Sequence, residues 1–336
     1  MRAKRRHKLL IGLLLVALLG PASSGAQIKS NFASSITSES MSAMWVARER
    51  GLFKKHGLEM QYVVIPRSPL AVAALIAGEI DAAIIGPGHL ISAGSTGADL
   101  IGVANFFQKL DYRLNARPEI KKPEDLRGKR VAISGPGSTS HLVSMLALQG
   151  LNVDPIQAKI ILLTIPGTEM NRRLALETGG VDATALRGAI GDLYGAKGFN
   201  VLYNLKAAGV TLPQTVLATT RRTAATKPQV IDAYLRTMIE AIAVTVDPAN
   251  KDSVMRTIAS NLRLSNPADA EDAYHTVVGA VERVPYLNLE NMKRLHRLLI
   301  QVNPKVADVK VESVIDNSFI SKLESSGYVQ SVYKKK

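Results

Sequence analysis

The sequence has 336 residues, no cysteine, 46% hydrophobic residues and a formal net charge of +14. This length is enough for two ordinary domains with hydrophobic cores, and the lack of cysteine excludes a fold held together by disulfides. Aromatic residues make up only 5% of the chain and no basic block is interleaved with them, which argues against nucleic-acid binding.

The first 26 residues have the pattern of a secretory signal peptide. Basic residues from Arg2 to Lys8 precede the apolar run Leu9–Leu19, and Ser24-Gly25-Ala26 supplies small residues before a cleavage site. An uncleaved membrane anchor is the alternative, and the adjacent Arg5-Arg6 leaves the export route open between the general secretory and twin-arginine pathways. Cleavage lowers the net charge from +14 to +9. Because no second long apolar run follows, we expect a soluble periplasmic protein.

The first part of the mature chain alternates predicted strands and helices. Strands are predicted over 27–34, 58–65 and 98–107, and a helix from Met41 to Gly51 with Ser38 or Ser40 as its N-cap. Between them lies a Pro-containing turn, an alanine-rich helix and a buried strand that ends at Gly86-Pro87. This order is typical of a parallel sheet covered by helices.

One motif in this region occurs twice. The stretch Ile65–Gly88 reads IPRSPLAVAALIAGEIDAAIIGPG, and Ile165–Gly188 reads IPGTEMNRRLALETGGVDATALRG. Ser68 recurs as Thr168, and Asp81 recurs as Asp182. We therefore predict two similar α/β lobes whose turns face each other at the functional site. The two aspartates are expected to hold the turns together rather than to contact a ligand.

The second lobe is predicted to begin after a charged segment. Residues 111–127 are interpreted as the crossing between lobes, and 128–134 as a strand that runs into a glycine-rich loop and a helix over 141–149, closed by Gly150. Further strands are predicted at 160–165 and 201–205, and the strand 216–220 is expected to return to the first lobe. The last third is predicted to be helical, over 230–246, 251–262, 268–284, 289–302 and 311–325.

Gly135–Ser140 carries the clearest signal for a binding site. A strand end, a glycine-rich bend and a helix start bring backbone N–H groups to one point, and Ser138, Thr139 and Ser140 add hydroxyl groups. Such an arrangement binds anionic or carbonyl oxygens without a charged side chain. The alternative is that Ser138 or Ser140 only caps its own helix.

Two arginines lie at turns that follow apolar strands. Arg67, which precedes Ser68, and Arg187 are each placed to bind a carboxylate, sulfonate or phosphate, or to be solvated turn residues. His89 and His141 lie at predicted helix starts, where burial or capping is the ordinary role, and Trp45 is expected in the core. No metal-binding spacing or Gly-x-Ser-x-Gly motif occurs, so an enzyme is not favoured.

Four segments resemble a known family, the nitrate/sulfonate/taurine-type solute-binding proteins of ABC importers, which also includes proteins that bind a thiamine-precursor pyrimidine. They are ARERGLFKKHGLEMQYV, ALIAGEIDAAIIG, LRGKRVAISGPGSTSH and DNSFISKLESSGYV. The resemblance implies a type II periplasmic-binding-protein fold, with two α/β lobes, a hinge and a ligand cleft. It implies ligand contacts from Ser38, Ser40, Arg67, Ser68, Gly86, Pro87, Ser138, Thr139 and Ser140. A related synthase branch depends on a cysteine motif, which this sequence lacks.

We therefore expect a monomeric periplasmic receptor that delivers a small polar or anionic molecule to an ABC permease in the inner membrane. No cofactor, metal or nucleic acid is expected. Lobe 1 is assigned to residues 27–110 plus 217–336, and lobe 2 to residues 111–216. The alternatives are an exported enzyme that uses the same cleft and a sensory receptor for a membrane signalling protein.

Overall fold

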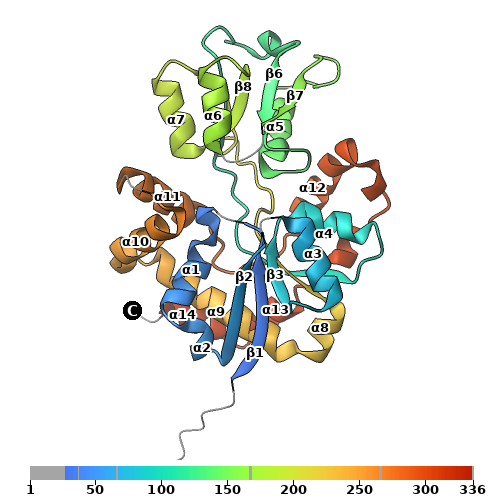
Figure 1. Ribbon diagram of the computed structural model, residues 1–336, viewed down its shortest axis with the longest axis vertical. Coiled ribbons are helices and arrows are strands. Elements are labelled where there is room, and N and C mark those ends of the chain that lie inside the picture. Colours follow the sequence, from blue (N-terminus) through green and yellow to red (C-terminus); the bar gives the residue numbers. More distant parts are fainter. Residues whose placement is uncertain (1–26, 37, 66, 166–168, 265–266, 335–336) are drawn as a thin grey trace, which may run out of the picture.

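The computed structural model shows two α/β lobes joined by two connecting segments (Figure 1). A five-stranded sheet forms the centre of each lobe. The structure describes residues 27–36, 38–65, 67–165, 169–264 and 267–334. The predicted signal peptide and Thr168, the counterpart of Ser68, lie outside these residues.

The sheet of lobe 1 has the strand order β2-β1-β3-β10-β4. Strand β1 is parallel to β2 and β3, whereas β10 lies antiparallel between β3 and β4. The prediction that the strand at 216–220 returns to the first lobe is therefore confirmed. The bounds are β1 Ile28–Ser34, β2 Leu58–Val64, β3 Ala82–Ile85, β4 Leu100–Asn105 and β10 Val216–Thr220.

The sheet of lobe 2 has the order β7-β6-β8-β5-β9. Strand β6 is parallel to β7 and β8, and β5 lies antiparallel between β8 and β9. The bounds are β5 Tyr112–Ala116, β6 Arg130–Ile133, β7 Ile161–Thr164, β8 Ala183–Arg187 and β9 Asn200–Asn204.

Strand β5 corrects the interpretation of residues 111–127 as a crossing. All five of its residues are buried, including Arg113. The Arg113 guanidinium is neutralised inside the lobe, because it donates hydrogen bonds to Asp111 at 2.6 Å and to both carboxylate oxygens of Asp192 at 2.8 and 2.9 Å. A buried arginine needs such partners. Because Arg113 is charged, the sequence pattern of this segment did not indicate a buried strand.

The repeated aspartates fasten equivalent strands. The Asp81 carboxylate accepts a hydrogen bond from the backbone N–H of Asn31 in β1, and the Asp81 N–H donates to the Asn31 carbonyl oxygen. In lobe 2, Asp182 makes the same two bonds with the backbone of Arg130 in β6. The internal repeat is therefore a repeat of structure as well as of sequence.

Each aspartate also has a basic partner. Lys227 lies 2.7 Å from Asp81, and the Arg130 guanidinium lies 2.9 Å from Asp182. These contacts agree with the prediction that both carboxylates hold the turns together.

The two connecting segments run antiparallel and bond to each other. The first follows β4 and the second precedes β10. Backbone hydrogen bonds join Gln214 to Phe107 at 2.9 Å and Leu212 to Gln108 at 2.8 Å. This paired ribbon is the narrow waist between the lobes in Figure 1.

Seven helices cover the sheets over residues 38–196, within the described part of that range. The predicted helix over 41–51 begins as a 3-10 turn, η1 Glu39–Met41. The bounds are α1 Ser42–Glu49, α2 Leu52–Lys55, α3 Ser68–Ala77, α4 Pro87–Gly94, α5 Thr139–Gly150, α6 Glu169–Glu177 and α7 Gly188–Ala196, with a further 3-10 turn η2 Pro123–Leu126.

The C-terminal third is helical, as predicted, and packs mostly on lobe 1 (Figure 1). Its α-helices are α8 Arg221–Thr226, α9 Pro228–Val246, α10 Lys251–Leu262, α11 Pro267–Ala280, α12 Leu289–Val302, α13 Ser318–Ser325 and α14 Tyr328–Lys334. Its 3-10 turns are η3 Pro248–Asn250, η4 Pro304–Val306 and η5 Val311–Val314. Within the described residues, none of the helices combines the length and the apolar character needed to span a membrane.

One face of the lobe 1 sheet packs against α1, α2 and α9 in a continuous hydrophobic core. Trp45 lies in this core and is 6% exposed, which confirms the prediction for it. Phe32 of β1 and Tyr234 of α9 meet there with ring centroids 4.9 Å apart. This core holds strand β1 in position, and the first turn of the functional site follows directly after β1.

Gly150 has a different role from the predicted helix stop. It is the last residue of α5 rather than the residue after it, and its φ is not positive. A Cβ at this position would lie 2.2–2.5 Å from the ring of Tyr203 in β9. Glycine is therefore needed there for close packing of helix on strand.

Candidate functional site

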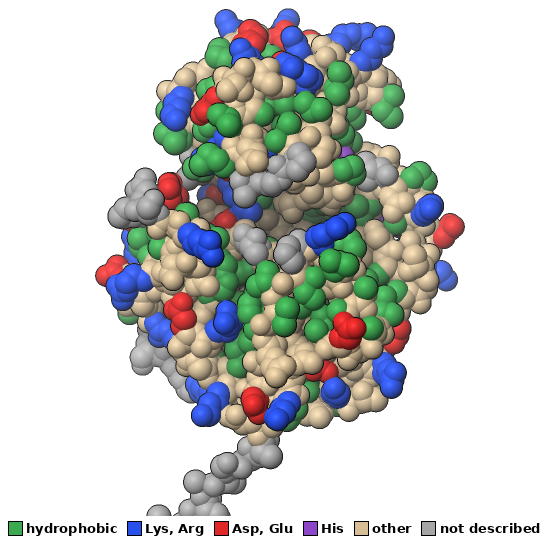
Figure 2. All heavy atoms as spheres, viewed as in Figure 1, with side chains coloured by type: hydrophobic (Ala, Val, Ile, Leu, Met, Phe, Trp, Pro, Cys, Tyr) green, Lys and Arg blue, Asp and Glu red, His purple; other side chains and the backbone are tan. Residues whose placement is uncertain are grey.

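A cavity of about 280 Å³ lies between the two lobes. The hollow is visible between the upper and lower parts of the molecule in Figure 2. Both lobes and both connecting segments line it. The lining residues are Ser35, Ile36, Ser38, Ser40, Ser68, Gly86, Pro87, Gly88, His89, Leu110, Tyr112, Gly137, Ser138, Thr139, Leu142, Arg187, Leu212, Pro213, Gln214 and Thr215.

The lobe 1 wall comes from turns at the carboxyl ends of β1 and β3. These two strands are parallel neighbours, so their ends meet at one edge of the sheet, where α3 and α4 begin. The hydroxyl groups of Ser35 and Ser68 lie 2.6 Å apart, and those of Ser38 and Ser40 lie 2.8 Å apart. Ser38 occupies the N-cap position of η1, but its side chain makes no capping bond. The wall is therefore rich in hydroxyl groups and in helix starts.

His89 lies in the first turn of α4 and lines the cavity. Burial lowers the pKa of His89 from its ordinary value of 6.5. The imidazole is therefore neutral at pH 7 rather than cationic.

The lobe 2 wall is the glycine loop between β6 and α5. Gly137 has a φ of +73°, which favours glycine, and its N–H donates to Nδ1 of His141 at 3.0 Å. Ser138 is the N-cap of α5 and accepts a hydrogen bond from the His141 N–H at 3.3 Å. Ser138 thus caps its helix and lines the cavity at the same time, and Thr139 beside it is exposed.

Ser140 and Arg67 do not line this cavity. Ser140 is 5% exposed, and its Oγ accepts a hydrogen bond from the backbone N–H of Ser134 at 2.8 Å, so it fixes the glycine loop from behind. Arg67 is exposed at the N-cap of α3. The other eight sequence-predicted site residues, Ser38, Ser40, Ser68, Gly86, Pro87, Ser138, Thr139 and Arg187, are brought together around the cavity.

Arg187 ends strand β8 and reaches across the cleft. Its guanidinium forms an ion pair with Glu39 of lobe 1, and its Nε lies 3.7 Å from the carboxylate of Glu169 in lobe 2. The backbone N–H of Arg187 donates to the same carboxylate at 3.3 Å. The guanidinium also lies 5.7 Å from the ring centre of Tyr112. Basic and acidic side chains can be seen together inside the hollow in Figure 2.

Burial between the lobes lowers the pKa of Arg187 to about 10, so the guanidinium keeps its charge at pH 7. Burial also raises the pKa of Glu169, an effect that Arg172 and Arg173 oppose.

Glu39 and Glu169 are the residues at this site that the sequence did not reveal. Glu39 stands between two predicted site residues, Ser38 and Ser40, and Glu169 follows the threonine that corresponds to Ser68. Position beside the repeated turns is the signal that could have identified them. Both carboxylates lie next to Arg187, which is apparent only when the two lobes are positioned relative to each other.

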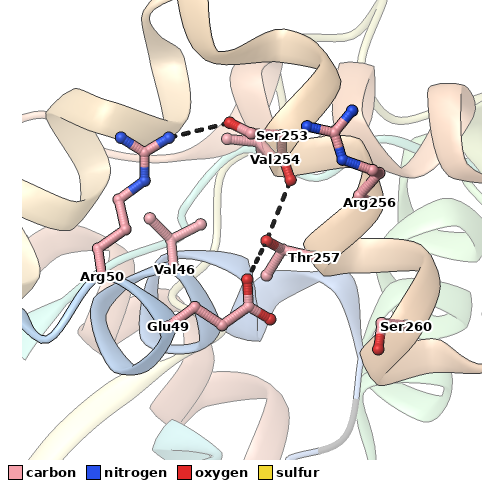
Figure 3. Close-up of a pocket in the computed structure, with 8 residues that line it drawn as sticks. All are labelled: Val46, Glu49, Arg50, Ser253, Val254, Arg256, Thr257 and Ser260. Atoms are coloured by element: carbon pink, nitrogen blue, oxygen red, sulfur yellow. Dashed lines mark hydrogen bonds between the residues drawn. The ribbon is translucent and has the colours of Figure 1, made fainter.

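A second hollow, of about 390 Å³, lies on the outside of lobe 1 between α1 and α10 (Figure 3). Four of its polar residues, Glu49, Arg50, Ser253 and Thr257, already form hydrogen bonds with each other. Glu49 accepts a hydrogen bond from Thr257 at 2.5 Å, and Arg50 donates to Ser253 at 2.9 Å. Figure 3 shows these side chains spanning the hollow, with Arg256 at its side. Among the described residues, no group of three or more His, Asp or Glu side chains is placed to hold a metal ion.

Comparison with solved structures identifies the class of fold, which is that of the periplasmic substrate-binding proteins of ABC importers. The aliphatic sulphonate-binding protein SsuA of Escherichia coli aligns with a TM-score of 0.71 and 22% identity, over 88% of this chain and 100% of that one. The alkanesulfonate-binding SsuA of Xanthomonas axonopodis pv. citri, bound to MOPS, aligns with a TM-score of 0.66 and 20% identity, over 87% of this chain and 99% of that one. The nitrate-binding NrtA of Synechocystis PCC 6803 aligns with a TM-score of 0.63 and 12% identity, over 92% of this chain and 91% of that one.

The family is identified from the sequence. Residues 39–250 match the family described as NMT1/THI5 like, and since this is more than half of the chain, the protein belongs to that family. A candidate binding protein of Brucella abortus is 32% identical over 114 residues, which is 33% of this chain and 35% of that protein. The chain thus matches about a third of the length of its curated relatives.

Proposed function

We propose that this protein is a periplasmic receptor that delivers a small polar or anionic molecule, of the sulfonate, nitrate or carboxylate type, to an ABC importer. The observation that carries this proposal is the cavity of about 280 Å³ that both lobes line with hydroxyl groups and helix starts. The sulfonate- and nitrate-binding proteins that share the fold support the ligand class. The partner is a permease in the inner membrane, and the receptor acts as a monomer.

The eight predicted residues around the cavity are proposed to contact the ligand. Thr139 and the turn at Gly86-Pro87 bring the first turns of α5 and α4 to the cavity. The unpaired N–H groups of a helix start favour acceptor oxygens of a ligand. Arg67 is at most a residue of the rim, and Ser140 acts by holding the glycine loop.

Closure of the two lobes on the ligand is the proposed mechanism. Residues 27–110 plus 217–336 move as lobe 1 and residues 111–216 as lobe 2, about the paired connecting segments. A closed receptor presents a surface that differs from the open one, so a permease can distinguish the loaded state. Hydrogen bonds to the ligand strengthen as the cleft loses water.

Native mass spectrometry of the protein purified from its source tests this function. We expect one small molecule bound per chain, and its removal should open the cleft and raise the radius of gyration measured by X-ray scattering. If the ligand is chemically unaltered after long incubation with the protein, the protein is a receptor, whereas conversion of the ligand would indicate an enzyme. If no molecule is retained and none in a cell extract stabilises the protein, the receptor function is refuted.

A variant links this ligand to the cavity. Thr139→Ala should weaken binding of the molecule so identified by about 1 kcal/mol, because one hydroxyl hydrogen bond is lost. Thr226→Ala, at the exposed end of α8, is the matched control and should leave calorimetric affinity unchanged. Equal affinities for all three proteins would place the ligand elsewhere.

A further inference from the structure

Arg187 carries the one full charge among the described residues that line the cavity. The other polar lining side chains are hydroxyl groups, Gln214 and His89, and His89 is neutral at pH 7. The charge that a ligand meets in this cleft is therefore decided by Arg187 and its partners.

The charge of Arg187 is already matched. Glu39 forms an ion pair with its guanidinium from the opposite lobe, and Glu169 lies 3.7 Å from its Nε. The Glu39 side chain is only 12% exposed. An anionic ligand that binds the guanidinium must displace Glu39, which leaves a nearly buried carboxylate without its partner, and that is costly. An anion that binds beside the pair meets a nearby carboxylate.

Uncharged acceptor groups meet no such obstacle. The starts of α3, α4 and α5 reach the cavity and supply partial positive charge to carbonyl or sulfonyl oxygens. Leu110, Leu142 and Leu212 provide an apolar surface for the body of a ligand.

We infer that Glu39 is the specificity-determining residue of this cleft, and that by occupying the guanidinium of Arg187 it selects a ligand without net negative charge, either neutral or zwitterionic. This inference rests on the proposed receptor function and narrows its ligand from polar or anionic to polar without net negative charge.

Binding of simple anions to a charge-neutralised variant tests the inference. Glu39→Gln keeps the shape of the side chain and removes its charge, and Glu79→Gln is the matched control. Glu79 is exposed just beyond the end of α3 opposite to the cavity, and it loses the same formal charge. The probes are ethanesulfonate, nitrate and taurine, where taurine is ethanesulfonate with an added ammonium group. Calorimetry gives the affinities, and thermal unfolding confirms that both variants fold.

We expect Glu39→Gln to bind ethanesulfonate and nitrate at least about tenfold more tightly than the wild type, since a buried like charge is removed. The gain should be smaller for taurine, whose ammonium group offsets the charge of its sulfonate. Glu79→Gln should behave as the wild type does. Wild-type protein that binds ethanesulfonate or nitrate as tightly as Glu39→Gln overturns the inference.

The charge of the ligand that co-purifies with the wild type is a second test that needs no variant. A neutral or zwitterionic molecule supports the inference. A molecule with net negative charge at pH 7 overturns it while leaving the receptor function intact, whereas failure to find any bound molecule counts against the receptor function itself.

Discussion

At the scale of single residues, Asp182 shows how one carboxylate sets both stability and its pH dependence. It accepts hydrogen bonds from the backbone N–H, Nε and Nη2 of Arg130, at 2.8, 2.9 and 2.9 Å. Chiefly through the Arg130 side chain, these bonds lower the pKa of Asp182 from its ordinary value of 3.8. A depressed carboxyl pKa stabilises the fold above the unfolded-state value, and the stability is lost as the pH falls toward the folded-state value.

Asp182→Asn should therefore lower the free energy of unfolding by about 1–3 kcal/mol at pH 7, because charge-assisted hydrogen bonds are lost. The difference from the wild type should shrink as the pH falls below about 4, because the Asp182 carboxylate of the unfolded chain then takes up a proton before that of the folded protein does. Urea unfolding at several pH values measures it. The exposed Asp308→Asn controls for net charge. A difference that stays constant down to pH 3 would contradict this account.

The roles of individual residues were predictable where the sequence repeats. Asp81 and Asp182 were expected to be structural because each stands at the same point of a recurring turn. Arg187 was left open between a ligand contact and a solvated turn residue, and its ion pair with Glu39 of the opposite lobe was not predicted. That pairing depends on how the two lobes approach each other, which periodicity within one lobe does not reveal.

At the scale of secondary-structure elements, the contact between α5 and β9 reverses the effect on stability that a glycine-to-alanine substitution usually has. Replacing glycine by alanine inside a helix usually stabilises the helix by about 1 kcal/mol. At Gly150 the added Cβ would lie 2.2–2.5 Å from the ring of Tyr203.

Gly150→Ala should instead lower the free energy of unfolding by about 1–3 kcal/mol, as overpacking does. In a Tyr203→Leu background the same change should be neutral or stabilising, because the ring is absent. Gly279→Ala in α11, where a Cβ meets no atom within 4 Å, should raise the stability. Thermal unfolding of the four variants measures this, and a loss at Gly150 that persists without the ring would argue against the packing explanation.

Most elements could be predicted from the sequence because strands of alternating or continuous apolar residues are bounded by glycine and proline. Strand β5 could not. Arg113 and Asn115 give the segment a polar appearance, and both are buried. The carboxylate that neutralises Arg113 from α7, Asp192, is 79 residues further along the chain. Local pattern does not reveal a partner at such a distance.

At the scale of the whole molecule, the two lobes follow one plan. In each sheet three parallel strands are followed by an antiparallel fourth strand, which is β10 in lobe 1 and β5 in lobe 2. Each fourth strand follows directly after a connecting segment. The repeated motif predicted the two similar lobes, and the return of the strand at 216–220 to lobe 1 was predicted as well. Its antiparallel position between β3 and β4, and the whole of β5, were not predicted.

The position of β10 has a consequence for biosynthesis. Strands β5 to β9 are contiguous, from Tyr112 to Asn204, so lobe 2 contains its whole sheet once that stretch has emerged. The sheet of lobe 1 is still incomplete at that point, because β10 lies between β3 and β4 and ends only at Thr220.

A chain that stops at residue 212 should show hydrogen-exchange protection in β6 and β8 but not in β4, and protection of β4 would contradict this order. The lobe that leads the sequence is thus the last to complete its fold, and until β10 has formed, β4 lacks its partner strand and is open to pairing with other chains.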